Sequence, residues 1–171
     1  MGYPPSLADT EVASKKFKAD LDALWATGKP ERQGWTREQL DALTWRVGLF
    51  ATRPDGTRDQ YWAKLGADYY DEAGPTVLFV DPANNSVAPN GSRWFPKLAK
   101  NPEWFALHPA YASQNYTGQL VCFSYNAFYE FTHGRPNADN CWIQGVHTVA
   151  AALYRLEEAL GKEYYECPSG P

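Results

Sequence analysis

The spacing of apolar residues predicts an amphipathic helix near each end of the chain. One apolar stripe runs from about Asp9 to Trp25, with its members three or four residues apart and charged residues mostly on the other faces. Gly28 and Pro30 then favour the end of that helix. A second stripe with the same period runs from about Trp142 to Leu160, and Gly161 after it is typical of a helix C-terminus.

Between these helices the pattern predicts three strands of an antiparallel meander. Trp45–Phe50 and Gln60–Leu65 are rich in aromatic and branched residues, and the turn residues Pro54–Gly56 separate them. The third predicted strand, Thr76–Val80, is apolar without interruption, as in a buried strand. Ahead of the strands, Thr36–Leu43 contains a capping-box pattern that predicts a short helical turn.

The remaining segments lack a clear period. Residues 81–107 carry many prolines, asparagines and aromatics, which predict a long ordered loop with one helical turn at most. Residues 119–123 form a short apolar segment, and His133–Asn140 form a polar loop. The tail, Lys162–Pro171, is expected to pack loosely. We therefore expect a single α+β domain over residues 1–171, with a core at about 9–160 and an inserted loop at about 81–107.

Composition removes several classes of function. Sixteen basic residues face twenty acidic ones, a net charge of -4 that argues against binding to a nucleic acid backbone. No stretch approaches the ~20 consecutive apolar residues that cross a membrane. The first ten residues lack the pattern of a signal peptide, and three cysteines are an odd, low number. We expect reduced thiols, a cytoplasmic location and no contact with membranes.

Three cysteines and three histidines are the candidates for chemistry, and no metal or cofactor motif accompanies them. Cys122 follows a turn at His108 and a polar loop in which Asn115 and backbone amides are plausible oxyanion donors. The position equally fits a small buried residue. Cys141 lies at the predicted helix start, where a lowered pKa or a structural thiol are both reasonable.

Several motifs, taken in order, resemble the core of the ubiquitin-conjugating enzymes over about Asp9 to Leu160. The chain differs from that family's pattern in Ala110, which stands in place of the asparagine of a His-Pro-Asn motif, and in its longer loops. Such divergence resembles bacterial relatives, including those encoded in antiphage operons. The matching segments are the hairpin Trp45–Gly56, the stretch Asp68–Pro75 with its following strand, His108-Pro109-Ala110, Gly118–Cys122, and Trp142 with its helix.

The resemblance implies a ubiquitin-conjugating-enzyme-like fold and a transferase that uses a thioester. Cys122 would receive the C-terminus of a ubiquitin-like modifier from an activating enzyme and pass it to an amine of a target protein. Asn115 and His108 are the expected neighbours of that cysteine, with Asn126 the alternative to Asn115. His133 is a further candidate as a proton acceptor. No cofactor is implied.

The first helix is implied to be the docking face for the activating enzyme, through Lys15, Lys16 and Lys18. A solvated helix face also explains these three lysines.

Three other functions stay open on the sequence alone. The missing asparagine fits an inactive variant of the fold that only binds a partner. The aromatic content of 15% fits a carbohydrate-binding module that stacks sugars on Trp94, Trp104 and Tyr111. A cysteine hydrolase would pair Cys122 with His108 or His133.

Overall fold

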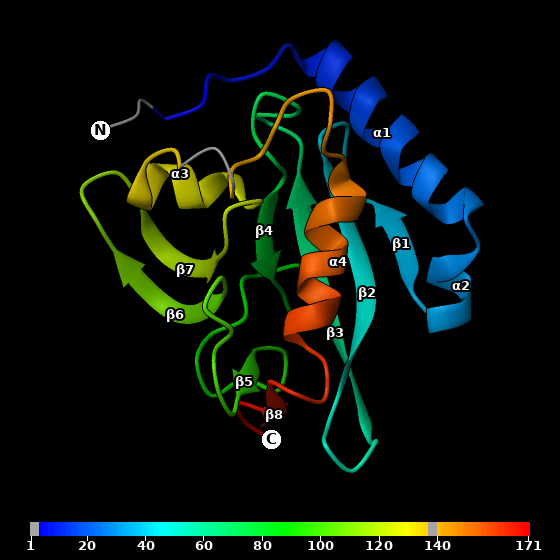
Figure 1. The fold of residues 1–171 in the computed structure, drawn as a ribbon, viewed down its shortest axis with the longest axis vertical. Coiled ribbons are helices and arrows are strands. Elements are labelled where there is room, and N and C mark those ends of the chain that lie inside the picture. The colour runs from blue at the N-terminus through cyan, green and yellow to red at the C-terminus, as the bar shows by residue number, and fades with distance from the viewer. Residues whose placement is uncertain (1–3, 137–139) are drawn as a thin grey trace.

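An antiparallel sheet of four strands forms the centre of the protein, in the order β1-β2-β3-β4 (Figure 1). A computed structural model describes residues 4–136 and 140–171. The predicted meander is confirmed. The short helical turn predicted at Thr36–Leu43 is wrong: this segment contains the strand β1, and its pairing with β2 overrides the local capping pattern. The strands are β1 (Thr36–Gln39), β2 (Thr44–Thr52), β3 (Arg58–Gly66) and β4 (Thr76–Phe79).

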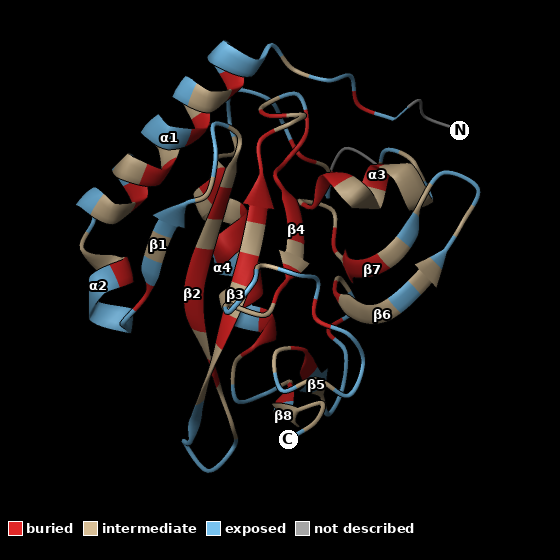
Figure 2. Cartoon of the chain, turned by 180° about the vertical axis from the view of Figure 1, so that it is seen from behind, coloured by how far each residue is buried: buried red, intermediate tan, exposed pale blue. Residues whose placement is uncertain are grey.

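Two helices pack against this sheet and against each other (Figures 1 and 2). α1 (Thr10–Ala26) begins at Asp9, whose side chain accepts a hydrogen bond from the amide of Val12, and it directs Phe17 and Leu21 into the core. The short α2 (Lys29–Gln33) follows it. α4 (Val149–Ala159) buries one side of its surface, and α1, α4 and the sheet share one hydrophobic core.

The second predicted helix is shorter than its apolar pattern suggested. α4 begins at Val149, whereas Ile143 to Thr148 form turns in which His147 Nδ1 accepts a hydrogen bond from the Ile143 amide at 2.8 Å. Gly145 adopts a φ of 75°, which interrupts a helix. Val146, expected in the apolar stripe, is 67% exposed as a result.

Two separate two-stranded sheets accompany the central one. β6 (Ala106–Ala112) and β7 (Thr117–Cys122) form an antiparallel hairpin, with β7 beside β4, and α3 (Ala127–His133) follows it. β5 (Pro96–Leu98) pairs with β8 (Tyr165–Pro168). The long loop therefore contains a strand, and the tail is a strand instead of a loosely packed end, because each supplies the pairing partner that the other lacks.

Side-chain amides join β7 to β4 in place of a backbone ladder. Gln119 accepts from the amide of Phe79 at 2.7 Å and donates to the carbonyl of Phe79 at 3.1 Å. Asn126 repeats this arrangement at Val77, at 3.0 and 3.2 Å. Both amides are buried, so this junction fixes the position of the hairpin and of α3 relative to the sheet.

The segment before β4 holds the start of α4 in place. Tyr70 donates its hydroxyl hydrogen to Asp20 of α1 at 2.6 Å and accepts from the amide of Val149 at 3.0 Å. The carbonyl of Asp71 accepts from the ring N–H of the buried Trp142 at 2.8 Å. Gly74 packs so closely that a Cβ there would lie 2.0 Å from the carbonyl oxygen of Tyr125.

Within the described residues, no helix combines the length and the apolar character that a membrane crossing requires.

Candidate functional site

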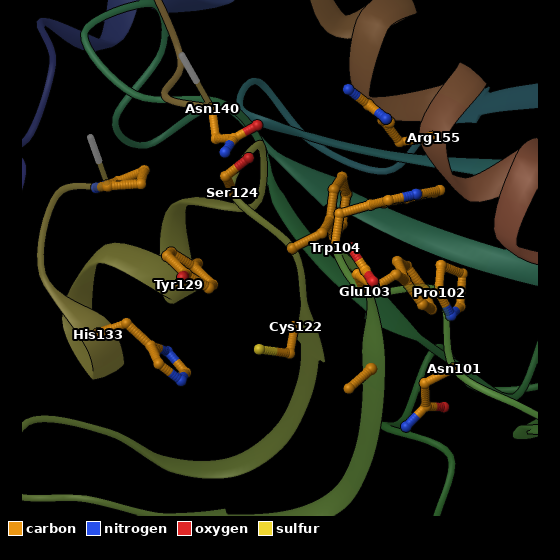
Figure 3. Close-up of a pocket in the computed structure, with 14 residues that line it drawn as sticks. Asn101, Pro102, Glu103, Trp104, Cys122, Ser124, Tyr129, His133, Asn140 and Arg155 are labelled. Atoms are coloured by element: carbon orange, nitrogen blue, oxygen red, sulfur yellow. The ribbon is translucent and has the colours of Figure 1, made fainter. Parts of the chain in front are cut away.

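Cys122 opens into a pocket of about 830 Å³ at the end of β7 (Figure 3). Its side chain is half-buried, and it lies between α3 on one side and the segment before β6 on the other. The pocket is lined by polar and aromatic groups from five parts of the chain: Asn101 to Ala106, Cys122 to Ser124, Tyr129 and His133, Pro136 and Asn140, and Arg155.

Burial alone raises the pKa of the Cys122 thiol to about 11. Cys122 is therefore a neutral thiol at neutral pH. A hydrolase that attacks its substrate with a preformed thiolate needs the opposite shift, which a neighbouring cation or helix N-terminus provides.

Aromatic and imidazole rings form a continuous row beside this thiol. The rings of Tyr129 and His133 stack with centroids 4.4 Å apart and an angle of 11° between their planes. Tyr111 lies 6.0 Å from His133 and 5.2 Å from His108. Desolvation lowers the pKa of His108, and the nearby His133 lowers it further. The thiol of Cys122 in turn raises the pKa of Tyr129, after the larger effect of burial.

The opposite wall of the pocket carries the charged groups. The guanidinium of Arg155 in α4 lies over the ring of Trp104 at 4.7 Å. Its contact with Glu158 is 3.9 Å long, too long for a strong hydrogen bond. Glu103 is exposed on the same wall, whereas Ser124 and Asn140 lie together at the other end of the pocket (Figure 3).

The structure brings His108, but not Asn115, near Cys122. His108 pairs with Leu120, two residues from Cys122, and so lies on the same face of the hairpin, about 7–8 Å away along the diagonal. Asn115 is exposed in the turn between β6 and β7, at the far end from Cys122. Asn126 is fully buried, and its amide hydrogens go to the carbonyls of Val77 and Val121.

The three lysines of α1 are each paired with an acid one turn away. Lys15, Lys16 and Lys18 contact Glu11, Asp20 and Asp22 at 2.6, 2.7 and 2.7 Å. This helix face therefore presents alternating charges instead of a basic patch.

The other candidates from the sequence lie outside the pocket. His147 packs against Tyr125 with ring centroids 4.7 Å apart, and Cys167 lies in β8. Cys141 is half-buried just before Trp142. Of the residues proposed to stack sugars, Trp94 is covered by Arg93 at 4.6 Å, and Tyr111 packs between the two histidines. Positions 137–139 of the predicted polar loop lie outside the described residues.

Sequence reasoning missed Tyr129, Ser124 and Asn140. A detectable signal existed for Tyr129: Asn126 is a good helix N-cap, and its side chain accepts from the amide of Phe128 at 3.2 Å. A helix that starts there places Tyr129 and His133 one turn apart on one face. Ser124 lies two residues after Cys122 in the chain, whereas Asn140 reaches the pocket only through tertiary packing.

Comparison with known proteins gives no identification: no protein-family model matches the chain, and no curated protein matches its sequence. Among residues 4–136 and 140–171, no group of three histidine, cysteine or acidic side chains is placed to bind a metal ion.

Proposed function

We propose that this protein is a conjugating enzyme that carries a ubiquitin-like modifier as a thioester on Cys122 and transfers it to an amine of a target protein. The observation that carries the proposal is the pocket at Cys122. It places a half-buried thiol among groups that can donate hydrogen bonds, including Tyr129 and His133. Such a site suits acyl exchange with a large activated partner.

The arrangement of elements supports the finer assignment to a ubiquitin-conjugating-enzyme-like fold. Along the chain, the motifs of the resemblance fall on successive elements of an α+β fold. These are α1, the four-stranded meander, the hairpin that carries Cys122, the buried Trp142, and α4. The motif segments also contact one another. Tyr70 and Asp71 of the stretch before β4 bind Trp142 and the first turn of α4.

In the loading step, the sulfur of Cys122 attacks the thioester carbonyl of the modifier on its activating enzyme. The new C–S bond forms as the old one breaks, and the thiol proton goes to the departing sulfur. Negative charge develops on the carbonyl oxygen and needs a donor. We assign that role to the hydroxyl of Tyr129, which lines the same pocket as Cys122.

Docking of the activating enzyme on α1 is part of the proposal. Because Lys15, Lys16 and Lys18 are each neutralised within the helix, a partner would have to compete with these ion pairs. Exposed pairs contribute little stability, about 0–1 kcal/mol, so this competition costs little.

The test is incubation of the protein with ATP, a ubiquitin-like modifier and the activating enzyme of that modifier. We expect an adduct that a thiol reductant removes and that Cys122→Ala does not form. Cys141→Ser, which alters a thiol outside the pocket, is the control and should form the adduct. Loss of the adduct in Cys141→Ser alone would contradict the assignment, and no adduct in the wild type would favour the binding scaffold.

A further inference from the structure

Resting on the proposed function, we infer that His133 is the base of the transfer step. Its Nε2 atom accepts the proton of the attacking amine and then delivers a proton to the sulfur of Cys122. Thr132 is the positioning residue that fixes the imidazole for this task.

The first support is the direction of the two side chains. His133 is the last residue of α3 and Cys122 is the last residue of β7, and both line the same pocket. In Figure 3 the thiol and the imidazole face each other across that hollow. The stacked ring of Tyr129 covers one face of the imidazole, which restricts its rotation.

The second support is the hydrogen bond that Thr132 makes with the ring. Thr132 Oγ1 lies 2.6 Å from His133 Nδ1 and 2.9 Å from the carbonyl oxygen of Tyr129. The hydroxyl has one hydrogen, and a carbonyl oxygen can only accept. That hydrogen therefore goes to Tyr129, and Nδ1 of His133 is the donor to Oγ1. The remaining ring nitrogen, Nε2, keeps its lone pair and is the basic atom.

The third support is the charge around the imidazole. Within residues 4–136 and 140–171, no carboxylate forms an ion pair with His133. Most groups around the imidazole are neutral: Tyr129 on α3, His108 and Tyr111 on β6, and Cys122 on β7. The charged groups are Glu103 and Arg155 on the far wall of the pocket and Arg135, two residues after His133.

The chemistry of the step explains why a base is needed here. The amine nitrogen forms a bond to the thioester carbonyl carbon, and the C–S bond then breaks with both electrons going to sulfur. The nitrogen must lose a proton, and the sulfur must gain one. Because burial raises the pKa of the Cys122 thiol to about 11, its thiolate is a poor leaving group. An imidazole between the two atoms satisfies both needs, and the products are an amide and a neutral thiol.

The experiment loads Cys122 without any partner protein. The probe is acetyl-Gly-Gly thioester of 2-mercaptoethanesulfonate, which exchanges onto a protein thiol. Peptide mapping locates the acyl group, the excess probe is removed, and free L-lysine is added. Intact-mass spectrometry follows discharge from about pH 6 to about pH 9, the interval that brackets histidine titration. A parallel sample without lysine gives the rate of hydrolysis.

We expect His133→Asn to become acylated like the wild type and to discharge to lysine at least about tenfold more slowly, since positioned general bases contribute roughly 10²–10⁴-fold. The dependence of the wild-type rate on pH should differ from that of His133→Asn, because the variant lacks the imidazole. Thr132→Val should slow discharge, whereas Thr132→Ser, which keeps the hydroxyl, should restore it. Thermal unfolding of each variant verifies that its fold is intact.

Two results would overturn the inference, and they are distinguishable. If Cys122 is acylated but His133→Asn discharges with the wild-type rate and pH profile, His133 is not the base and the proposed function stands. If the probe does not acylate Cys122 in the wild type, the proposed function fails and the inference fails with it.

Discussion

The functions that the sequence left open make different demands on one thiol. A cysteine hydrolase, an acyl carrier and an inert structural cysteine all place a cysteine in or near a protein interior. They differ in the pKa of the thiol and in what surrounds it. Cys122 combines access to a pocket with a pKa raised by burial, which differs from the preformed thiolate of a cysteine hydrolase.

The reactivity of Cys122 toward iodoacetamide should therefore depend steeply on pH. The thiolate is the reacting form, so the alkylation rate should rise about tenfold per pH unit from neutral pH up to about pH 10 and level off only near the pKa of about 11. Peptide mapping by mass spectrometry measures the rate at Cys122 separately from Cys141 and Cys167. A rate that levels off below pH 7 would indicate a stabilised thiolate and favour the hydrolase.

At the scale of elements, the junction between β4 and β7 determines where the pocket lies. The outer edge of β4 offers backbone groups at Val77 and Phe79, and buried side-chain amides satisfy them. The cysteine hairpin and α3 are thus attached to the sheet through Asn126 and Gln119. Both residues help to fix the position of the pocket walls, although neither lines the pocket.

Substituting Asn126 with alanine should lower the free energy of unfolding by about 3–5 kcal/mol, since buried backbone groups at β4 and β7 lose their partners. Asn115→Ala is the matched control, because Asn115 is exposed in a turn and should change stability by less than about 0.5 kcal/mol. Urea denaturation measures both. Similar values for the two variants would contradict the role assigned to Asn126.

Periodicity was a sound guide wherever a segment buries one face against the sheet. α1, β2, β3 and β4 were predicted to within a few residues because their apolar positions repeat with the period of the element. It failed where pairing with a distant segment decides the structure. β1 carries the pattern of a helix start but pairs with β2, and β5 and β8 are strands because each pairs with the other.

The candidate site was predictable only in part for the same reason. Cys122 and His108 share a hairpin, so the sequence places them close together. Asn115 looked close to Cys122 along the chain, but strand geometry carries it to the opposite end of that hairpin. Asn101, Asn140 and Arg155 come from segments far apart in sequence, and no local pattern could assign them to one pocket.

At the scale of the whole molecule, a series of hydrogen-bonded side chains connects β8 to the central sheet. The hydroxyls of Tyr61 and Tyr165 lie 2.6 Å apart, and Tyr165 donates to Asp59 at 2.8 Å. Arg53 also donates to Asp59, at 2.7 Å, and this hydrogen bond lowers the pKa of the carboxyl group. Because Tyr165 gives its one hydrogen to Asp59, Tyr61 is the donor to Tyr165.

Removing the hydroxyl of Tyr165 should therefore cost more than removing that of Tyr61. Tyr165→Phe deprives Asp59 of a donor and leaves the buried Tyr61 hydroxyl without its acceptor, a loss of about 2–3 kcal/mol in the free energy of unfolding. Tyr61→Phe keeps the bond from Tyr165 to Asp59 and should cost about 1 kcal/mol. Equal losses in urea denaturation would contradict this order of donors.

The pairing of β5 with β8 also bears on how the chain folds during synthesis. Residues of the meander leave the ribosome long before Tyr165, which is buried in the core beside Tyr61. Until then β5 lacks its partner strand, and Asp59 lacks the hydrogen bond from Tyr165. A nascent chain stalled before residue 165 should remain sensitive to protease, and release of a few more residues should complete the fold in one cooperative step.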